Sequence, residues 1–63
     1  MTPAQFRRIR ETQGLSQGGL APLLGVHIQT VSRLERGAIP ISGTIAHLMQ
    51  ALATGWRPTP ETK

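Results

Sequence analysis

The segment from Ile28 to Arg36 carries the side chains of this chain that are best suited to recognising another molecule. Read as a helix, its 3.6-residue period places Thr30, Val31 and Leu34 on one side. The opposite, mostly polar side holds Ile28, Gln29, Ser32, Arg33 and Arg36. Because this side combines an amide with a guanidinium and has few acids nearby, we expect it to bind hydrogen-bonding groups of a partner.

These side chains match the base edges in the major groove of duplex DNA. Arg33 can donate two hydrogen bonds to O6 and N7 of guanine, Gln29 can bond an adenine edge, and Ile28 can cover a thymine methyl group. We predict that Ile28, Gln29, Ser32 and Arg33 read bases. The competing interpretation is a solvated helix face without a partner.

The charge balance also favours a polyanionic partner. Seven Lys and Arg residues stand against three acids, which gives a formal charge of +4. With one Phe, one Trp and no Tyr, the chain lacks the aromatic platform on which single strands stack, so we expect double-stranded DNA. No motif indicates a cofactor or a small-molecule ligand.

Several other classes of protein do not fit the composition. The chain has no Cys, and His27 and His47 lack the spaced companions of a metal site. Three acids and two distant histidines offer no nucleophile, base and orienting group, so we do not expect an enzyme. No apolar run approaches a membrane span or a signal peptide, and we expect a cytoplasmic protein, associated with the nucleoid when bound to DNA.

Glycines punctuate the chain at positions 14, 25, 37 and 55, each after a stretch with helical apolar spacing. The fold class predicted is all-α, a compact four-helix domain over residues 1–55 with a short tail at 56–63. Thr2 and Gln5 form a capping box for a first helix, and Ser16, His27 and Ser42 are the expected N-caps of the others. The expected helices run from Pro3 to Gln13, from the Ser16 cap to about Leu24, from Ile28 to Arg36, and from about Thr44 to Leu52.

Only Gly25, Val26 and His27 separate the second and third expected helices, so these helices must meet at a steep angle, as a helix-turn-helix. The first and fourth helices then complete one core. In it, Phe6, Ile9, Leu48 and Leu52 are expected to cover Leu20, Leu23, Leu24, Val31 and Leu34.

The sequence resembles the Cro and phage-repressor type (XRE-like) of helix-turn-helix family, whose fold is the lambda-repressor-like one. The resemblance covers about residues 6 to 52. It rests on Leu15-Ser16-Gln17, Leu20-Ala21, Leu24-Gly25-Val26 and Thr30-Val31-Ser32-Arg33-Leu34-Glu35-Arg36-Gly37. It implies that Gln17, with Ser16 beside it, bonds a DNA phosphate and that Ile28, Gln29 and Arg33 read bases. It also implies a structural ion pair between Arg10 and Glu35.

Further phosphate contacts are expected from His27, Thr30 and Arg36. For His27 the plainer role is a helix cap or surface residue. Arg7 and Arg8 are spaced to pair with Glu11, so a phosphate contact and a solvated face remain open for both. The chain departs from the family at Gly18, Gly19 and Pro22, which are expected to bend or weaken the second helix. His27 also replaces the usual Ser or Thr cap.

One recognition helix touches only four or five base pairs, so useful specificity calls for a symmetric homodimer on an inverted repeat. The interface expected from the fourth helix and the tail comprises His47, Leu48, Ala51 and Trp56. Trp56 either seals the core of its own chain or anchors the second copy.

The predicted function is therefore that of a transcriptional regulator, specifically an autoregulatory repressor. Small proteins of this type resemble phage or mobile-element regulators, including anti-CRISPR-associated autorepressors. The alternative is an antitoxin-like or other protein-interaction module with secondary DNA binding. The tail after Gly55 offers little chain with which to wrap a toxin.

Overall fold

Four α-helices follow one another in residues 1–58, the part of the chain that the computed structural model describes. They are α1 (Pro3–Thr12), α2 (Gln17–Leu24), α3 (Ile28–Glu35) and α4 (Gly43–Ala53). No strand occurs among these residues. The prediction of an all-α domain with four helices is confirmed, and the helix ends differ from those expected by a residue or so. The last residues of the expected tail, 59–63, lie outside the described part.

Polar side chains begin three of the four helices. The Thr2 hydroxyl accepts a hydrogen bond from the Gln5 amide at 3.1 Å, and the Gln5 side chain accepts one from the Thr2 amide at 2.9 Å. Ser16 accepts from the Gly19 amide, and Ser42 accepts from the Ile45 amide. These bonds satisfy N–H groups that have no partner within the helix, so the caps confirm the starts expected from the sequence.

The four glycines at the predicted helix ends all adopt positive φ, between 71° and 94°. Gly25 matters most, because its φ of 72° ends α2 in the left-handed conformation that reverses the chain toward α3. The α2 helix itself continues through Pro22, an exposed residue that cannot donate a backbone hydrogen bond to Gly18.

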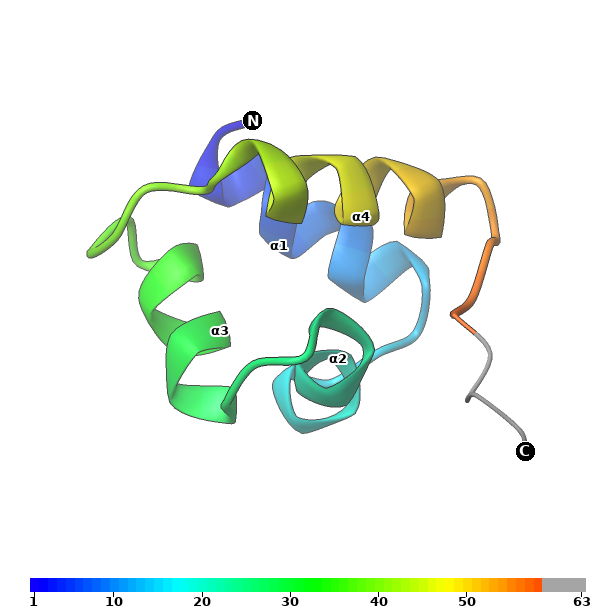
Figure 1. Cartoon of the computed structure of the whole chain (residues 1–63), viewed down its shortest axis with the longest axis horizontal. Helices are drawn as coiled ribbons and strands as arrows, with labels where there is room; N and C mark the ends of the chain where they lie inside the picture. Colours follow the sequence, from blue (N-terminus) through cyan, green and yellow to red (C-terminus); the bar gives the residue numbers. More distant parts are fainter. Residues whose placement is uncertain (59–63) are drawn as a thin grey trace.

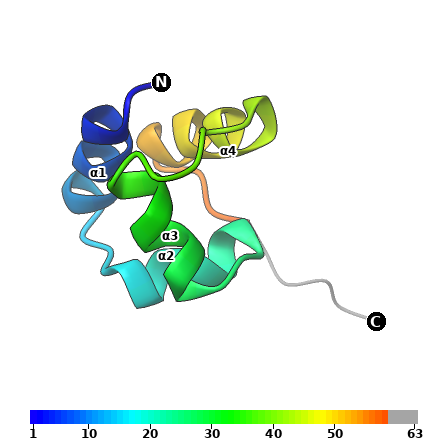
Figure 2. The ribbon, with the colours of Figure 1, turned by 90° about the vertical axis from the view of Figure 1, so that its left-hand side faces the viewer.

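In space, α1 and α4 lie side by side, and α2 and α3 lie on the other side of the core (Figure 1). The view in Figure 1 looks nearly along α2 while α3 runs across it, so the two helices meet steeply. After a quarter turn the same two pairs remain, with the N-terminus beside α1 and α4 (Figure 2). This arrangement leaves one long side of α3 without a neighbouring helix.

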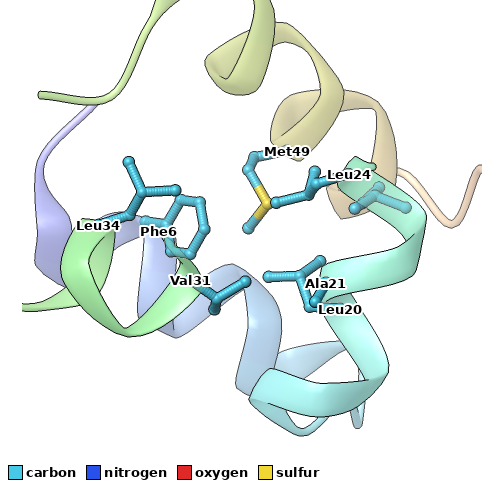
Figure 3. Packing of buried hydrophobic residues seen from close by; sticks show 8 residues of the cluster. Phe6, Leu20, Ala21, Leu24, Val31, Leu34 and Met49 are labelled. Atoms are coloured by element: carbon cyan, nitrogen blue, oxygen red, sulfur yellow. The ribbon is translucent and has the colours of Figure 1, made fainter. Parts of the chain in front are cut away.

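One apolar cluster joins the four helices (Figure 3). Its buried members are Phe6, Leu20, Ala21, Leu24, Val31, Leu34, Met49 and Leu52. Leu48 packs against the cluster as expected but is half-buried at its edge, whereas its neighbour Met49 is fully buried. Ile9 and Leu23 also pack at the edge.

Candidate nucleic-acid interface

The turn between α2 and α3 fixes the direction of α3. The Val26 amide donates to the carbonyl of Ala21 at 3.0 Å, which folds the chain back over the end of α2. Val26 itself is half-buried and packs against the core. Because both the backbone and a side chain hold this turn, α3 has a defined orientation relative to α2.

The two sides of α3 differ sharply in exposure. Val31 and Leu34 are 0% and 2% exposed, whereas Ile28 is 51% exposed. Gln29, Arg33 and Arg36 are also exposed, and Thr30 and Ser32 are half-buried. The outer side of α3 therefore displays an aliphatic group and an amide on its first turn and a guanidinium on the next, groups that can match base edges in a major groove.

The first turn of α3 lacks the side-chain cap that begins the other helices. His27 occupies the N-cap position with a φ of −75° and a ψ of 154°, but its imidazole accepts no hydrogen bond from the first turn. Only the His27 carbonyl contributes, accepting from the Thr30 and Val31 amides. The exposed imidazole thus stands next to Ile28 at the start of the polar face.

A polar cluster of Arg10, Gln17 and Glu35 lies behind this face and connects α1, α2 and α3. The Arg10 Nε donates to Oε2 of Glu35 at 2.5 Å, and its Nη2 donates to Oε1 at 3.2 Å. The Gln17 amide donates to the same Oε1 at 3.1 Å. The side chains of Arg10 and Glu35 are only 11% and 6% exposed. The structure thus brings Arg10 and Glu35 together across 25 positions of sequence.

The third member of this cluster was missed from the sequence. The family resemblance implied only a phosphate contact for Gln17, and no spacing signal relates it to Glu35. The one hint was the position of Glu35 between the two faces of its helix. Gln17 is half-buried at the first turn of α2, and its amide is held by a carboxylate before any ligand arrives.

The Glu35 carboxylate raises the pKa of Arg10 above the usual arginine value, chiefly by accepting its hydrogen bonds. Burial acts in the opposite direction, and the charges of Glu35 and Glu11 add to the increase. Arg10 also donates to the carbonyl of Leu15 at 2.8 Å, which ties the α1–α2 connection to the cluster. Arg10 is therefore a permanent cation with a structural position.

The other cations of the described residues are arranged more loosely. Arg7 pairs with Glu11 at 3.1 Å across one turn of α1, with both side chains more than half exposed. Arg8, Arg33 and Arg36 are exposed and form no ion pair within residues 1–58. Exposed cations without a protein partner can approach phosphates at little cost, since no ion pair must first break.

The end of α4 and the residues after it bear on the expectation for the tail. Of the two roles left open for Trp56, sealing the core of its own chain does not fit the structure, because its side chain is 45% exposed and is not a member of the core. Arg57 holds the tail, donating to the Gln13 side chain at 3.2 Å at the end of α1. On α4, His47 is exposed and Ala51 is half-buried.

No helix of residues 1–58 has the length and hydrophobicity needed to cross a membrane. In the same range, no three His, Asp or Glu side chains converge as the ligands of a metal ion would.

The four helices, the short α2–α3 turn and the exposed face of α3 define a helix-turn-helix domain, a class that binds DNA and is typically not enzymatic. Over residues 4–59 the sequence matches the family described as a helix-turn-helix domain, and the chain belongs to that family. Neither the curated proteins nor the solved structures include a significant match to this chain.

Proposed function

We propose that this protein is a sequence-specific regulator of transcription, acting as a homodimeric autorepressor on an inverted-repeat operator. In this proposal α3 enters the major groove, and Ile28, Gln29, Ser32 and Arg33 read base edges. Ser16, Gln17, His27, Thr30 and Arg36 contact the flanking phosphates. The helix-turn-helix family supports DNA binding, and the residues of α3 are our assignment.

The observation that carries the proposal is the division of α3 into a buried and an exposed side. Val31 and Leu34 hold the helix in the core, while Ile28, Gln29 and Arg33 point away from it and contribute nothing to the buried cluster. A helix with a purely structural role does not need exposed side chains that match the edges of DNA bases. The formal charge of +4 supports the same partner, because it attracts DNA before specific contacts form.

The dimer is proposed from the surface formed by α4 and Trp56. Residues 43–56 contain no Asp, Glu, Lys or Arg, although the chain as a whole is strongly basic. Two copies with like charge can approach most easily through an uncharged surface, and the centres of protein interfaces are depleted in charge and enriched in aromatic residues. His47, Leu48, Ala51 and Trp56 are the contacts assigned to the second copy.

The experiment that tests this function is a binding selection from random duplex DNA at ~150 mM salt, where nonspecific phosphate attraction is weakened. We expect recovery of an inverted repeat whose half-sites lie one helical turn, about 34 Å, apart. A single half-site would contradict the dimer, and the absence of any recovered motif would contradict sequence-specific regulation. That last result would favour a protein partner, as an antitoxin-like module requires.

A further inference from the structure

Beyond its ion pair with Arg10, Glu35 accepts a hydrogen bond from Gln17, a side chain proposed to contact DNA. We infer that Glu35 is a positioning residue for DNA binding, which holds the Gln17 amide so that one N–H stays on the carboxylate while the other reaches a phosphate. The inference rests on the phosphate contact of Gln17 in the proposed function. It assigns Glu35, and through it Arg10, a role in DNA binding in addition to the stabilisation of the fold by their ion pair.

The first step concerns the hydrogens of the Gln17 amide. Its nitrogen carries two hydrogens, and one of them points at Oε1 of Glu35. Among residues 1–58 the Gln17 side chain has no second hydrogen-bond partner. Because Gln17 is half-buried rather than buried at the first turn of α2, the remaining N–H is available to a group outside the protein.

The second step is the cost of fixing a long side chain. A free glutamine loses rotamer freedom when it binds, and that loss lowers affinity. Here the loss is incurred during folding, since the amide is already bonded to a carboxylate that is only 6% exposed. A phosphate therefore meets a donor that is already oriented, and this preorganisation increases the affinity that the Gln17 contact provides.

The third step is charge. A lone carboxylate 3.1 Å from the Gln17 nitrogen would repel an approaching phosphate. Arg10 removes this repulsion, because two of its nitrogens donate to the same carboxylate and its pKa is raised above the usual value. The three-residue cluster thus offers phosphate an amide donor on a pair with no net charge.

The test is a double-mutant cycle on DNA affinity with Gln17→Met, Glu35→Gln and the double variant. Gln17→Met keeps the length of the side chain but removes the amide. We expect each single variant to weaken binding to the selected operator and to unrelated duplexes alike, by about tenfold. The double variant should bind no more weakly than the weaker single variant. Additive losses, or a Gln17→Met protein that binds like the wild type, would overturn the inference.

Gln5→Met is the matched control, since Gln5 is an exposed glutamine on α1 whose side chain bonds the Thr2 amide, outside both α3 and the proposed dimer surface. It should leave affinity unchanged. A wild-type protein that binds no duplex overturns the proposed function as well. A wild type that binds its operator, with independent effects at positions 17 and 35, overturns only the inference.

Because Glu35→Gln leaves Arg10 without a counter-charge and can unfold the domain, the side-chain amide signals of Gln17 in the wild-type protein provide a second measurement. On addition of operator, we expect the proton bonded to Glu35 to keep its chemical shift while the other proton moves. A duplex with a neutral methylphosphonate at the contacted phosphate should abolish that movement. A change in the Glu35-bonded proton instead would mean that Gln17 leaves Glu35 on binding, and the inference would be wrong.

Discussion

A methyl group added at Gly18 of α2 would lie 3.5 Å from Cδ1 of Ile28, the first residue of α3. That distance is ordinary van der Waals contact. Gly19, one residue further on, differs: its added methyl group would lie 3.3 Å from the Ser16 hydroxyl that caps the same helix.

The two glycines therefore predict opposite tolerances to alanine. Gly18→Ala should raise the free energy of unfolding by about 0.5–1 kcal/mol, because alanine is the better helix former and the site has space. Gly19→Ala should gain less or lose stability, since it crowds the cap. Urea denaturation of both variants measures the difference, and equal gains at the two positions would contradict the crowding.

Removing one partner of the largely buried Arg10–Glu35 ion pair should cost far more. Arg10→Met strands the Glu35 carboxylate, at about 3–5 kcal/mol. A core of this size supplies roughly 3–5 kcal/mol in total, so the variant should be largely unfolded at room temperature by circular dichroism. The double variant Arg10→Met/Glu35→Leu removes both charges and should recover most of the helix signal. Without that recovery, loss of packing by the Arg10 stem would be the better explanation.

The same pair predicts how stability responds to pH. Because folding raises the pKa of Arg10, its contribution is complete below the ordinary arginine pKa and is lost only as the pH rises through the higher folded value. Arg10 should therefore cause no loss of stability across neutral and mildly alkaline pH. Across that pH range, the urea midpoint should depend on pH in the same way in the wild type and in Arg10→Met/Glu35→Leu.

Arg33→Ala should weaken binding to the selected operator by about 1–3 kcal/mol and relax the preference at one base pair. Gln17→Ala should weaken all sequences to a similar degree, because phosphates are the same at every site. Arg7→Ala is the charge control, since Arg7 is exposed and already paired with Glu11. Fluorescence anisotropy on every single-base variant of the operator separates these cases. Equal losses for Arg33→Ala and Gln17→Ala on every sequence would refute α3 as the recognition helix.

Ile28 should detect one thymine methyl group. Replacing that thymine by deoxyuridine removes the methyl group and should cost the wild type about 0.8 kcal/mol, or roughly fourfold in affinity. Ile28→Ala should bind the two duplexes equally well, whereas Gln29→Ala should still distinguish them. A scan of deoxyuridine through the operator locates the position, and a wild type indifferent to every substitution would refute this role.

Trp56→Ala should weaken the dimer while changing the stability of the single chain by no more than about 1 kcal/mol, because nearly half of the side chain is already exposed. Sedimentation at several protein concentrations measures the dimer. Ile39→Ala, at another exposed apolar residue outside α4, is the control and should not change the dimer. If both variants dimerise like the wild type, the surface around Trp56 is not the interface.

The sequence predicted the helix ends well, because these depend on residues only a few positions apart. Thr2, Ser16 and Ser42 cap helices because each side chain bonds an amide three residues further along, and Gly25 ends one because its own backbone tolerates positive φ. Such features need no knowledge of the fold, which is why the helix ends were predicted closely.

Features that depend on how helices cross were not predictable. Leu48 and Met49 are neighbours on one apolar stripe, and only the angle at which α4 meets α1 places Met49 in the core. The Gln17 bond to Glu35 likewise depends on the approach of α2 to α3, and the Arg57 contact with Gln13 joins residues 44 positions apart. The expected base and phosphate contacts stay predictions, because they require the partner.

The side of α3 that carries Ile28, Gln29 and Arg33 makes no contribution to the buried cluster. If these residues read the operator as proposed, operator preference and folding depend on separate residues of the same helix. A library randomised at these three positions should consist mostly of folded proteins, and the scaffold could be reprogrammed to new target sequences without compensating changes in its core. Glu35 marks the limit of that freedom, because it lies on the same helix but holds both the Arg10 guanidinium and the Gln17 amide.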